Sequence, residues 1–290
     1  MTTTDAPAPS RFVGRTVLIT GSTGIAAASA RRIAAEGGTV FVATRTAAHG
    51  EALVAELRTI GAQADLTAVD LLEPEAAGRA VDACVAVFGR LDAVFNVAGG
   101  SGRKAGDGPV DQATAAGWDA TLDLNARSLF LVCGAAVRVM LGQERDRDGG
   151  RGSILNMSSI LSRHPSPAYF GTHAYAAAKG AINALTVTMA ARYAADGIRV
   201  NAVLPSLTRT PMAGRAAADP ATVAYATWKQ PLAQGLLEAD DIAPAAAFLL
   251  SGDAARITGQ LLEIDGGFGV TEMPRQPTEG ESAAAGASDR

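Results

Sequence analysis

The chain has 290 residues, of which 48% are hydrophobic, a size that allows one large α/β domain or two small ones. Its formal net charge is −4 and its basic residues are scattered, so nothing favours a nucleic acid or an anionic membrane as partner. No linker divides the sequence. We therefore expect a single domain over residues 11–271, with disordered tails at residues 1–10 and 272–290, which lack apolar periodicity.

Signals for export or membrane insertion are weak. Residues 1–10 contain no basic segment followed by an apolar one, as a signal peptide would. The most apolar long stretch, residues 122–141, is interrupted by four polar side chains: Asp123, Asn125, Arg127 and Arg138. We expect a cytoplasmic protein.

Cysteine and histidine give no sign of a disulfide or a metal site. Cys84 and Cys133 lie in apolar helical runs without a CxxC pattern, which favours buried reduced thiols. The three histidines are not spaced as metal ligands. We therefore predict no bound metal.

Short β-branched runs alternate along the chain with longer alanine-rich helical patterns. The expected order is strand 16–20, helix 26–36, strand 39–43, helix 47–60, strand 64–69, helix 74–88, strand 93–97, helix 125–140 and strand 153–157. Strands at 198–203 and 261–264 follow, with a helix at 242–250 between them. This alternation predicts α/β class: a Rossmann-type doubly wound parallel sheet of about seven strands, with helices on both faces and ligands at its carboxyl edge.

The run VLITGSTGIA, residues 17–26, places glycines where the first strand turns into the first helix. At such a turn the backbone can approach a pyrophosphate closely, and the helix N-terminus faces its negative charge. We expect five residues of this turn to bind a dinucleotide: Gly21, Ser22, Thr23, Gly24 and Ile25.

Tyr175 and Lys179 lie four positions apart in HAYAAAKG, residues 173–180, so a helix would present both on one face. A fixed cation beside a phenol favours the phenolate and lowers a pKa that is ordinarily about 10. Such a pair suits acid–base catalysis near neutral pH. The same spacing also occurs in solvated surface pairs, so the surrounding motifs decide the interpretation.

Those motifs, in their order and spacing, resemble the short-chain dehydrogenase/reductase family over about residues 11–270. They are the glycine turn, NVAG at 96–99, LNA at 124–126, NMSS at 156–159, the tyrosine–lysine pair, RVNAVLP at 199–205 and ITGQLLEIDGG at 257–267. Taken singly, Asn96, Asn125 and the serines of NMSS could equally have structural roles. Together they identify the chain as resembling a member of this family.

The resemblance implies four catalytic residues. Tyr175 would exchange a proton with the substrate oxygen, Ser159 would orient that oxygen, and Lys179 would lower the pKa of Tyr175 and hold the nicotinamide ribose. Asn125 would position a water that relays protons. It also implies further dinucleotide contacts, in which Tyr175 and Lys179 take part alongside Asp70, Leu71, Asn96, Ala98, Gly99, Pro205, Thr208 and Thr210.

The activity implied is NAD(P)-dependent hydride transfer between nicotinamide C4 and a small-molecule carbonyl or secondary alcohol. For the substrate, the family resemblance alone suggests a 3-oxoacyl thioester. A noncatalytic dinucleotide sensor stays open, as does a nucleotide-sugar epimerase or dehydratase of the extended branch; enoyl reduction is disfavoured because that branch spaces its tyrosine and lysine more widely. The family also suggests a homotetramer built on the helices that contain residues 125–140 and 175–193, with the last strand forming another contact and a homodimer left open.

The chain departs from the family pattern in several places. Gly21 and Gly24 are separated by two residues instead of three, which resembles the extended branch. Ser159 lies sixteen positions before Tyr175, about three more than usual, so we expect a larger loop at residues 163–170 over the substrate. Ser206 replaces a glycine, and residues 213–238 lack one clear period, consistent with a lid over about residues 206–238.

The end of the second predicted strand bears on the choice of dinucleotide. An acid there would bind a free ribose 2′-hydroxyl, whereas a cation would accommodate a 2′-phosphate. The sequence places Thr44 where that acid would fall and Arg45 next to it. NADP(H) is therefore favoured, and NAD(H) stays open.

Overall fold

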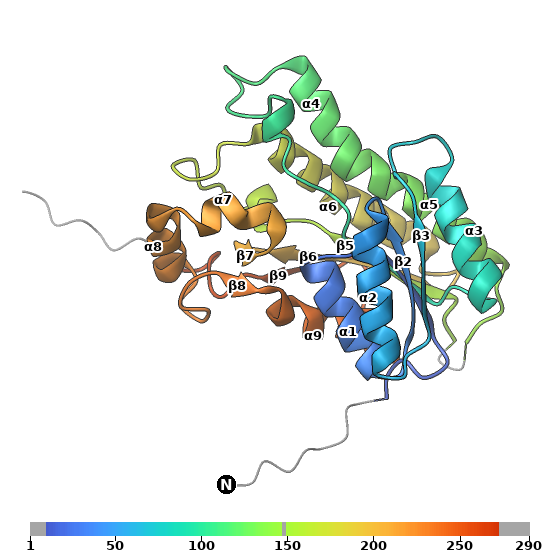
Figure 1. Cartoon of the computed structure of the whole chain (residues 1–290). Coiled ribbons are helices and arrows are strands. Elements are labelled where there is room, and N and C mark those ends of the chain that lie inside the picture. The colour runs from blue at the N-terminus through green and yellow to red at the C-terminus, as the bar shows by residue number, and fades with distance from the viewer. Residues whose placement is uncertain (1–9, 147–148, 273–290) are drawn as a thin grey trace, which may run out of the picture.

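The computed structural model describes residues 10–146 and 149–272, and Figure 1 shows their arrangement. The disorder predicted for residues 1–10 and 272–290 lies almost entirely outside these described residues. At the centre is a seven-stranded parallel sheet with the order β3-β2-β1-β4-β5-β6-β9. Its strands are β1 (Thr16–Thr20), β2 (Thr39–Thr44), β3 (Ala64–Ala68), β4 (Ala93–Asn96), β5 (Gly152–Met157), β6 (Ile198–Pro205) and β9 (Leu261–Ile264). The predicted Rossmann-type sheet in a single domain is confirmed.

Helices cover both faces of the sheet. One hydrophobic cluster joins it to α1 (Ile25–Ala35), α2 (Ala47–Thr59) and α9 (Ala239–Leu250). A second cluster joins the other face to α3 (Ala76–Phe88), α5 (Ser128–Gly142) and α6 (His173–Tyr193). The helix expected to begin at residue 125 instead begins earlier, as α4 (Ala115–Leu122), and continues through the π-helical turn η2 (Asp123–Arg127) into α5.

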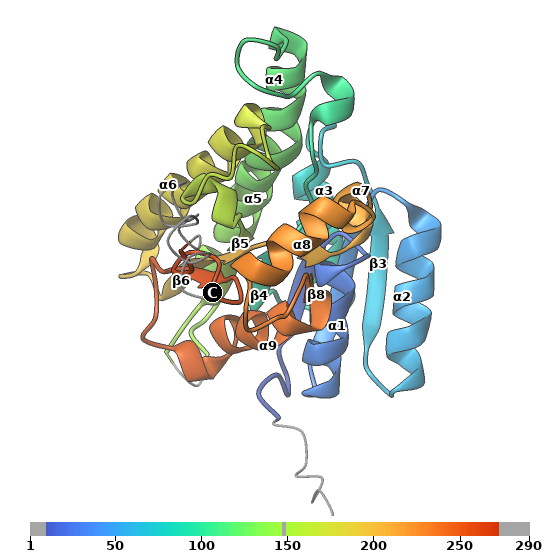
Figure 2. The same ribbon diagram turned by 90° about the vertical axis from the view of Figure 1, so that its left-hand side faces the viewer.

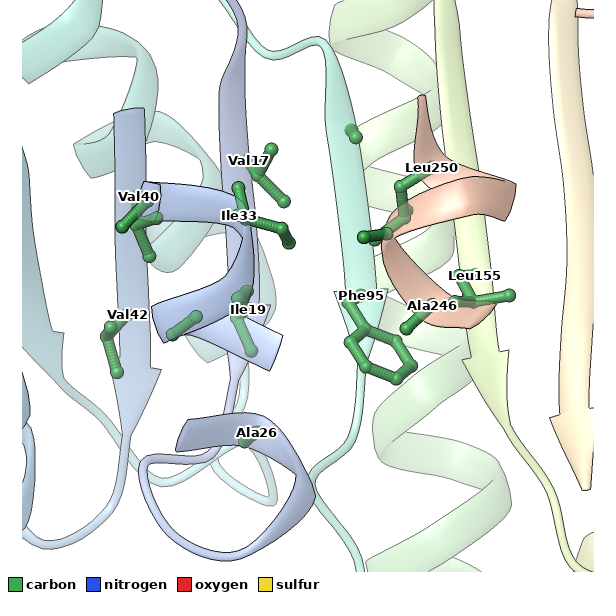
Figure 3. Packing of buried hydrophobic residues seen from close by; sticks show 14 of the residues in the cluster. Val17, Ile19, Ala26, Ile33, Val40, Val42, Phe95, Leu155, Ala246 and Leu250 are labelled. Carbon is green, nitrogen blue, oxygen red and sulfur yellow. The ribbon is translucent and has the colours of Figure 1, made fainter. Parts of the chain in front are cut away.

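Alternate residues of the central strands face opposite clusters, because side chains of a strand point to its two faces in turn. Val17 and Ile19 of β1 pack beside Phe95 of β4 against Ile33 of α1 and Leu250 of α9, as Figure 3 shows. Leu18, between them, belongs to the cluster on the other face. Burial on both faces explains why β1 reads as an uninterrupted apolar run.

The reversal of strand order between β1 and β4 places the expected ligand crevice at the carboxyl ends of the central strands. Short elements between β6 and α9 lie at this edge, where Figure 2 shows α7 and α8 in front of the strands. They are β7 (Thr208–Arg209), η4 (Pro211–Ala213), α7 (Gly214–Ala217), α8 (Pro220–Lys229) and β8 (Leu237–Glu238). The remaining short helices are η1 (Arg103–Ala105), η3 (Ile160–Ser162) and η5 (Gly252–Ala254).

One helical segment, Ala115–Gly142, is long and apolar enough to cross a membrane by length and composition alone. Half of its most apolar window is buried inside the protein. Several of its side chains, among them Leu129 and Val132, belong to the cluster shared with α3 and α6. This segment is therefore a core helix of the fold.

Candidate active site

A cavity of about 320 Å³ opens at the carboxyl edge of the sheet, between the glycine turn, the ends of β4 and β5, α6 and the segment after β6. Most of the predicted site residues line it: Gly21, Ser22, Thr23, Gly24, Ile25, Ala98, Gly99, Ser159, Tyr175, Lys179, Pro205, Thr208 and Thr210. Five others do not: Arg45, Asp70, Leu71, Asn96 and Asn125.

The glycine turn forms a cradle at one end of this cavity. Gly21 and Gly24 have φ values of 94° and 54°, a region that side chains disfavour. Gly24 begins α1 without a side-chain cap, and the first turn of α1 carries no acidic residue. A Cβ on Gly24 would lie 3.0 Å from Cγ2 of Thr210. The first N–H groups of a helix lack partners within it, and the turn lines the cavity, so this helix start fits a dinucleotide pyrophosphate.

Next to the turn, Ser22 and Thr44 share a hydrogen bond of 2.8 Å between their hydroxyl oxygens, and both side chains are buried. This pair occupies the end of β2, where the sequence predicts contact with the adenosine ribose. Arg45 follows immediately and is exposed to solvent. Arg45 is not among the residues that line the cavity.

Tyr175 lies in the first turn of α6, and Ser159 follows β5. Ser159 Oγ accepts a hydrogen bond from Leu161 N at 3.2 Å, which fixes the start of η3. Burial raises the pKa of Tyr175 to about 12, and a hydrogen bond with Ser159 opposes that rise. The lowering expected from Lys179 is wrong for this structure, because desolvation of the phenolate outweighs every other influence on Tyr175.

Lys179 is only 3% exposed, one helical turn after Tyr175. Its Nζ donates a hydrogen bond of 2.9 Å to the carbonyl oxygen of Met157 and lies 5.4 Å from the centroid of the Tyr175 ring. Burial lowers the pKa of Lys179 to about 7. The same environment therefore disfavours charge on both members of the pair.

Asn125 is fully buried in η2, behind the cavity wall. Its Nδ2 donates to the carbonyl oxygens of Thr121 at 2.8 Å and Gly100 at 2.9 Å, and its Oδ1 accepts from Gly100 N at 3.2 Å. A Cβ on Gly99 would lie 2.7 Å from Asn125 Oδ1 and 3.7 Å from Lys179 Nζ. Asn125 thus anchors the loop after β4 beside the lysine, and its predicted water-relay role stays a prediction.

Three other predicted cofactor residues have structural partners. Asn96 Nδ2 donates to Asn156 Oδ1 at 3.1 Å, across the register pair of β4 and β5. Asp70 Oδ1 accepts from Leu72 N at 3.0 Å and shapes the turn after β3, and Leu71 is buried in the core. Dinucleotide contacts by these residues stay predictions.

Large apolar side chains make up part of the lining of the cavity that also contains Tyr175. They are Ile160, Leu161, Phe170, Leu207, Met212 and Phe268. Behind them, Tyr169 of the enlarged loop stacks on Tyr225 of α8 with ring centroids 4.0 Å apart, and Ser166 Oγ lies 2.7 Å from Tyr225 Oη. Tyr225 and Trp228 do not line the cavity, so their role here is packing of α8.

Sequence reasoning missed Phe170, Phe268 and Arg103 as cavity residues. The unusual interval between Ser159 and Tyr175 pointed to the loop that carries Phe170. Nothing local marks Phe268 or Arg103, because tertiary packing alone brings them to this edge.

This geometry defines a class of protein: a dinucleotide-binding oxidoreductase, with a glycine cradle at one end of the cavity and a Tyr–Lys–Ser cluster at the other. Known proteins agree with that class. The family model described as Enoyl-(Acyl carrier protein) reductase matches residues 19–269. A 2,5-dichloro-2,5-cyclohexadiene-1,4-diol dehydrogenase of Sphingobium indicum is 31% identical, covering 90% of this chain and 98% of the relative.

Two further proteins are similar over nearly their whole length. A cis-4-hydroxycyclohexanecarboxylate dehydrogenase of Sinomonas cyclohexanicum is 32% identical, covering 89% of this chain and 97% of the relative. A crystal structure of levodione reductase has a TM-score of 0.80 and 31% identity, covering 89% of this chain and 98% of that one.

The chain belongs to the short-chain dehydrogenase/reductase family. It is an oxidoreductase that acts on alcohol or carbonyl groups of small molecules with a nicotinamide dinucleotide. These relatives give no support to a noncatalytic sensor or to an extended-branch epimerase or dehydratase.

Proposed function

We propose that this enzyme interconverts a cyclic secondary alcohol and its ketone, with NADP(H) as the favoured dinucleotide. The observation that carries the proposal is the apolar part of the cavity lining: Phe170, Phe268 and Met212 line the same cavity as Tyr175 and Ser159. Such a wall suits a hydrocarbon ring, because binding removes apolar surface from water. Two relatives named above for cyclohexane or cyclohexadiene substrates support the same class.

In this proposal Tyr175 Oη transfers the proton to or from the substrate oxygen, and Ser159 Oγ holds that oxygen by a hydrogen bond. Lys179 keeps a hydrogen-bond donor beside the tyrosine ring. Asn125 fixes the loop that lies between Asn125 itself and Lys179. The dinucleotide, held at the glycine cradle, supplies or accepts hydride at nicotinamide C4. Apolar side chains around the pair exclude water from the reacting carbon.

The preference for NADP(H) rests on the end of β2. Thr44 offers no carboxylate to a ribose 2′-hydroxyl, and its own hydroxyl is bonded to Ser22. Arg45, exposed directly after β2, carries a planar cation suited to a 2′-phosphate. A parallel assay with NADPH and NADH tests this preference directly.

An acidic group on the substrate is part of the proposal. Arg103, in the loop after β4, and Arg215, in α7, both line the cavity, and neither has an ion pair among residues 10–146 and 149–272. Burial lowers the pKa of Arg103, the positive charge of Arg215 lowers it further, and the negative charge of Asp107 opposes both effects only in part. A substrate carboxylate would relieve this repulsion, and a relative named for a cyclohexanecarboxylate supports that class.

A homotetramer in the cytoplasm completes the proposal. Phe130 of α5, Val187 of α6 and Leu262 of β9 are 55%, 45% and 39% exposed, and all three lie on elements that the family resemblance assigns to subunit contacts. Exposed apolar side chains on those elements favour association. Sedimentation at micromolar concentration tests it, and a monomer would refute it.

The deciding experiment compares 4-oxocyclohexanecarboxylate with 4-methylcyclohexanone, following absorbance of the reduced nicotinamide with NADPH and NADH. We expect turnover of the acid and a weaker reaction of the neutral ketone. Arg103→Gln should raise KM for the acid by about 10- to 100-fold and leave the neutral ketone unchanged, as loss of a charge-assisted hydrogen bond requires.

The control on the catalytic assignment uses two tyrosines of α6. Tyr175→Phe should remove at least about 99% of turnover with dinucleotide binding retained, whereas Tyr193→Phe, at the far end of the helix, should change neither. Substantial turnover by Tyr175→Phe would show that another group moves the proton.

A further inference from the structure

The first turn of α6 receives its cap from a distant loop. A helix begins with backbone N–H groups that have no partner within the helix, and the residue before α6, Thr172, supplies no side-chain cap. Instead, Asp107 Oδ1 accepts from Ala174 N and Asp107 Oδ2 accepts from Tyr175 N, both at 3.0 Å. Asp107 is only 7% exposed and follows η1 in the loop between β4 and α4.

Two more hydrogen bonds join the same loop to the same turn. His173 N donates to the carbonyl oxygen of Gly108 at 3.1 Å. In the opposite direction, Val110 N donates to Nδ1 of the His173 side chain, also at 3.1 Å. The loop and the first turn of α6 are therefore joined at four points, with donors on both sides, and a rigid-body shift of Tyr175 would strain all of them.

The loop is itself held in place by α4. Within the loop, Asp107 N donates to the carbonyl oxygen of Gly102 at 3.1 Å. The contacts with α4 are made by glycines. A Cβ on Gly117 of α4 would lie 2.3 Å from the Gly106 carbonyl carbon, so the two backbones are packed as closely as glycine permits. A Cβ on Gly102 would overlap Thr121 Oγ1 at 1.6 Å. No slack is left between the loop and the helix that continues into Asn125.

Asp107 therefore lies between two parts of the catalytic apparatus. Upstream, Gly100 of the same loop is bonded to Asn125, and Gly99 lies against both Asn125 and Lys179. Downstream, the carboxylate holds the backbone of Tyr175. One buried side chain thus couples the position of the catalytic tyrosine to that of the asparagine and of the cavity wall near Gly99.

We propose that Asp107 is a positioning residue for the reaction: its carboxylate sets where Tyr175 stands relative to Ser159 and the cavity. This inference rests on the proposed function, in which Tyr175 moves the proton. A carboxylate suits the place because it accepts from two N–H groups at once and its negative charge complements the positive end of the helix dipole. Proton transfer is sensitive to displacement, and an error of about 1 Å lowers turnover by about 100-fold.

The test compares three variants with the wild type: Asp107→Ala, Asp107→Asn and the matched control Asp111→Asn. Asp111 is an exposed carboxylate on the same segment, with no hydrogen bond or ion pair among residues 10–146 and 149–272. Dinucleotide titration gives the dissociation constant and the number of competent sites. Turnover is then expressed per site, so that loss of folded protein does not count as loss of kcat.

We expect Asp107→Ala to lower kcat per site by about 10- to 100-fold, as a displacement of up to about 1 Å predicts, with the dinucleotide dissociation constant within about threefold of wild type. Asp107→Asn should fall between, because an amide oxygen accepts one of the two bonds while its NH₂ faces a donor. Asp111→Asn should stay within twofold. This order of kcat, with the dissociation constant unchanged, is not expected of a residue that only stabilises the fold.

A kcat per site within twofold of wild type in both Asp107 variants would overturn the inference, even if their melting temperatures fell. If Asp107→Ala does not fold, Asp107→Asn alone decides by the same criterion. Failure of the proposed function is distinguishable, because it would appear as an inactive wild type or an active Tyr175→Phe, whereas failure of this inference leaves both of those results as expected.

Discussion

Replacing Lys179 by methionine should stabilise the protein in the absence of dinucleotide at neutral pH. Burial lowers the pKa of Lys179 from 10.5 to about 7. A lysine whose pKa falls on folding weakens the fold fully below its folded pKa, and progressively less as the pH rises toward its unfolded value. Methionine has nearly the same length and no charge, so it removes this penalty at every pH.

The expected size follows from the two pKa values. They differ by about 3.5, which at 1.36 kcal/mol per pKa unit is about 5 kcal/mol below pH 7. Against this, methionine leaves the carbonyl oxygen of Met157 without its donor, which costs about 1–3 kcal/mol. The net gain in the free energy of unfolding is about 2–4 kcal/mol at pH 6.5. At pH 10 the lysine penalty is below about 1 kcal/mol, so the variant becomes equally or less stable, and the difference changes sign near about pH 9.

Denaturant unfolding at pH 6.5 and pH 10, without dinucleotide, measures both values by tryptophan fluorescence. Lys104→Met, at an exposed lysine, is the matched control and should change stability by less than about 0.5 kcal/mol. A Lys179→Met variant that is less stable than wild type at pH 6.5, or whose gain is the same at both pH values, would refute the reasoning. The same variant should lose most turnover, because the donor beside the Tyr175 ring is gone.

Three other substitutions test separate parts of the structure. Arg45→Ala should raise KM for NADPH by about 10- to 100-fold and leave KM for NADH within threefold; equal effects on both would contradict the 2′-phosphate assignment. Gly117→Ala should destabilise the protein by about 1–3 kcal/mol or more in thermal unfolding, since its Cβ meets the backbone of the loop before α4. Gly78→Ala, in open space on α3, is its control and should be neutral or stabilising by about 1 kcal/mol. Tyr225→Ala removes the stack behind the cavity wall and should raise substrate KM several-fold with dinucleotide affinity unchanged; unaltered substrate KM would separate α8 from substrate binding.

The sheet could be predicted from the sequence because both of its faces are buried. Residues such as Val17, Leu18 and Ile19 give an uninterrupted apolar run that only a covered parallel strand explains. The region before Asn125 was missed for a physical reason as well. Gly117 sits inside α4, and the π-helical turn η2 breaks the regular period that identifies helices.

The catalytic pair could be predicted because four-residue spacing on a helix is a local property. The direction of the Tyr175 pKa could not, because it depends on how completely the tertiary fold excludes water from the ring. Asp107 was likewise beyond local reasoning, since its hydrogen bonds reach residues 67 and 68 positions later. Contacts of that range follow from topology, which a periodic pattern does not encode.

Two buried polar side chains of the site differ in how many hydrogen-bond partners they have. The Asp107 carboxylate accepts two N–H groups at the positive end of a helix, so the protein replaces much of the hydration that the carboxylate loses. The Lys179 ammonium donates only to the oxygen of Met157 among the described residues, so burial leaves it poorly compensated and its pKa falls. The site therefore places a carboxylate with two hydrogen-bond donors beside the tyrosine backbone and a poorly compensated ammonium beside the tyrosine ring. Stability and turnover should then decline together when Asp107 is removed, and diverge at neutral pH when Lys179 is removed.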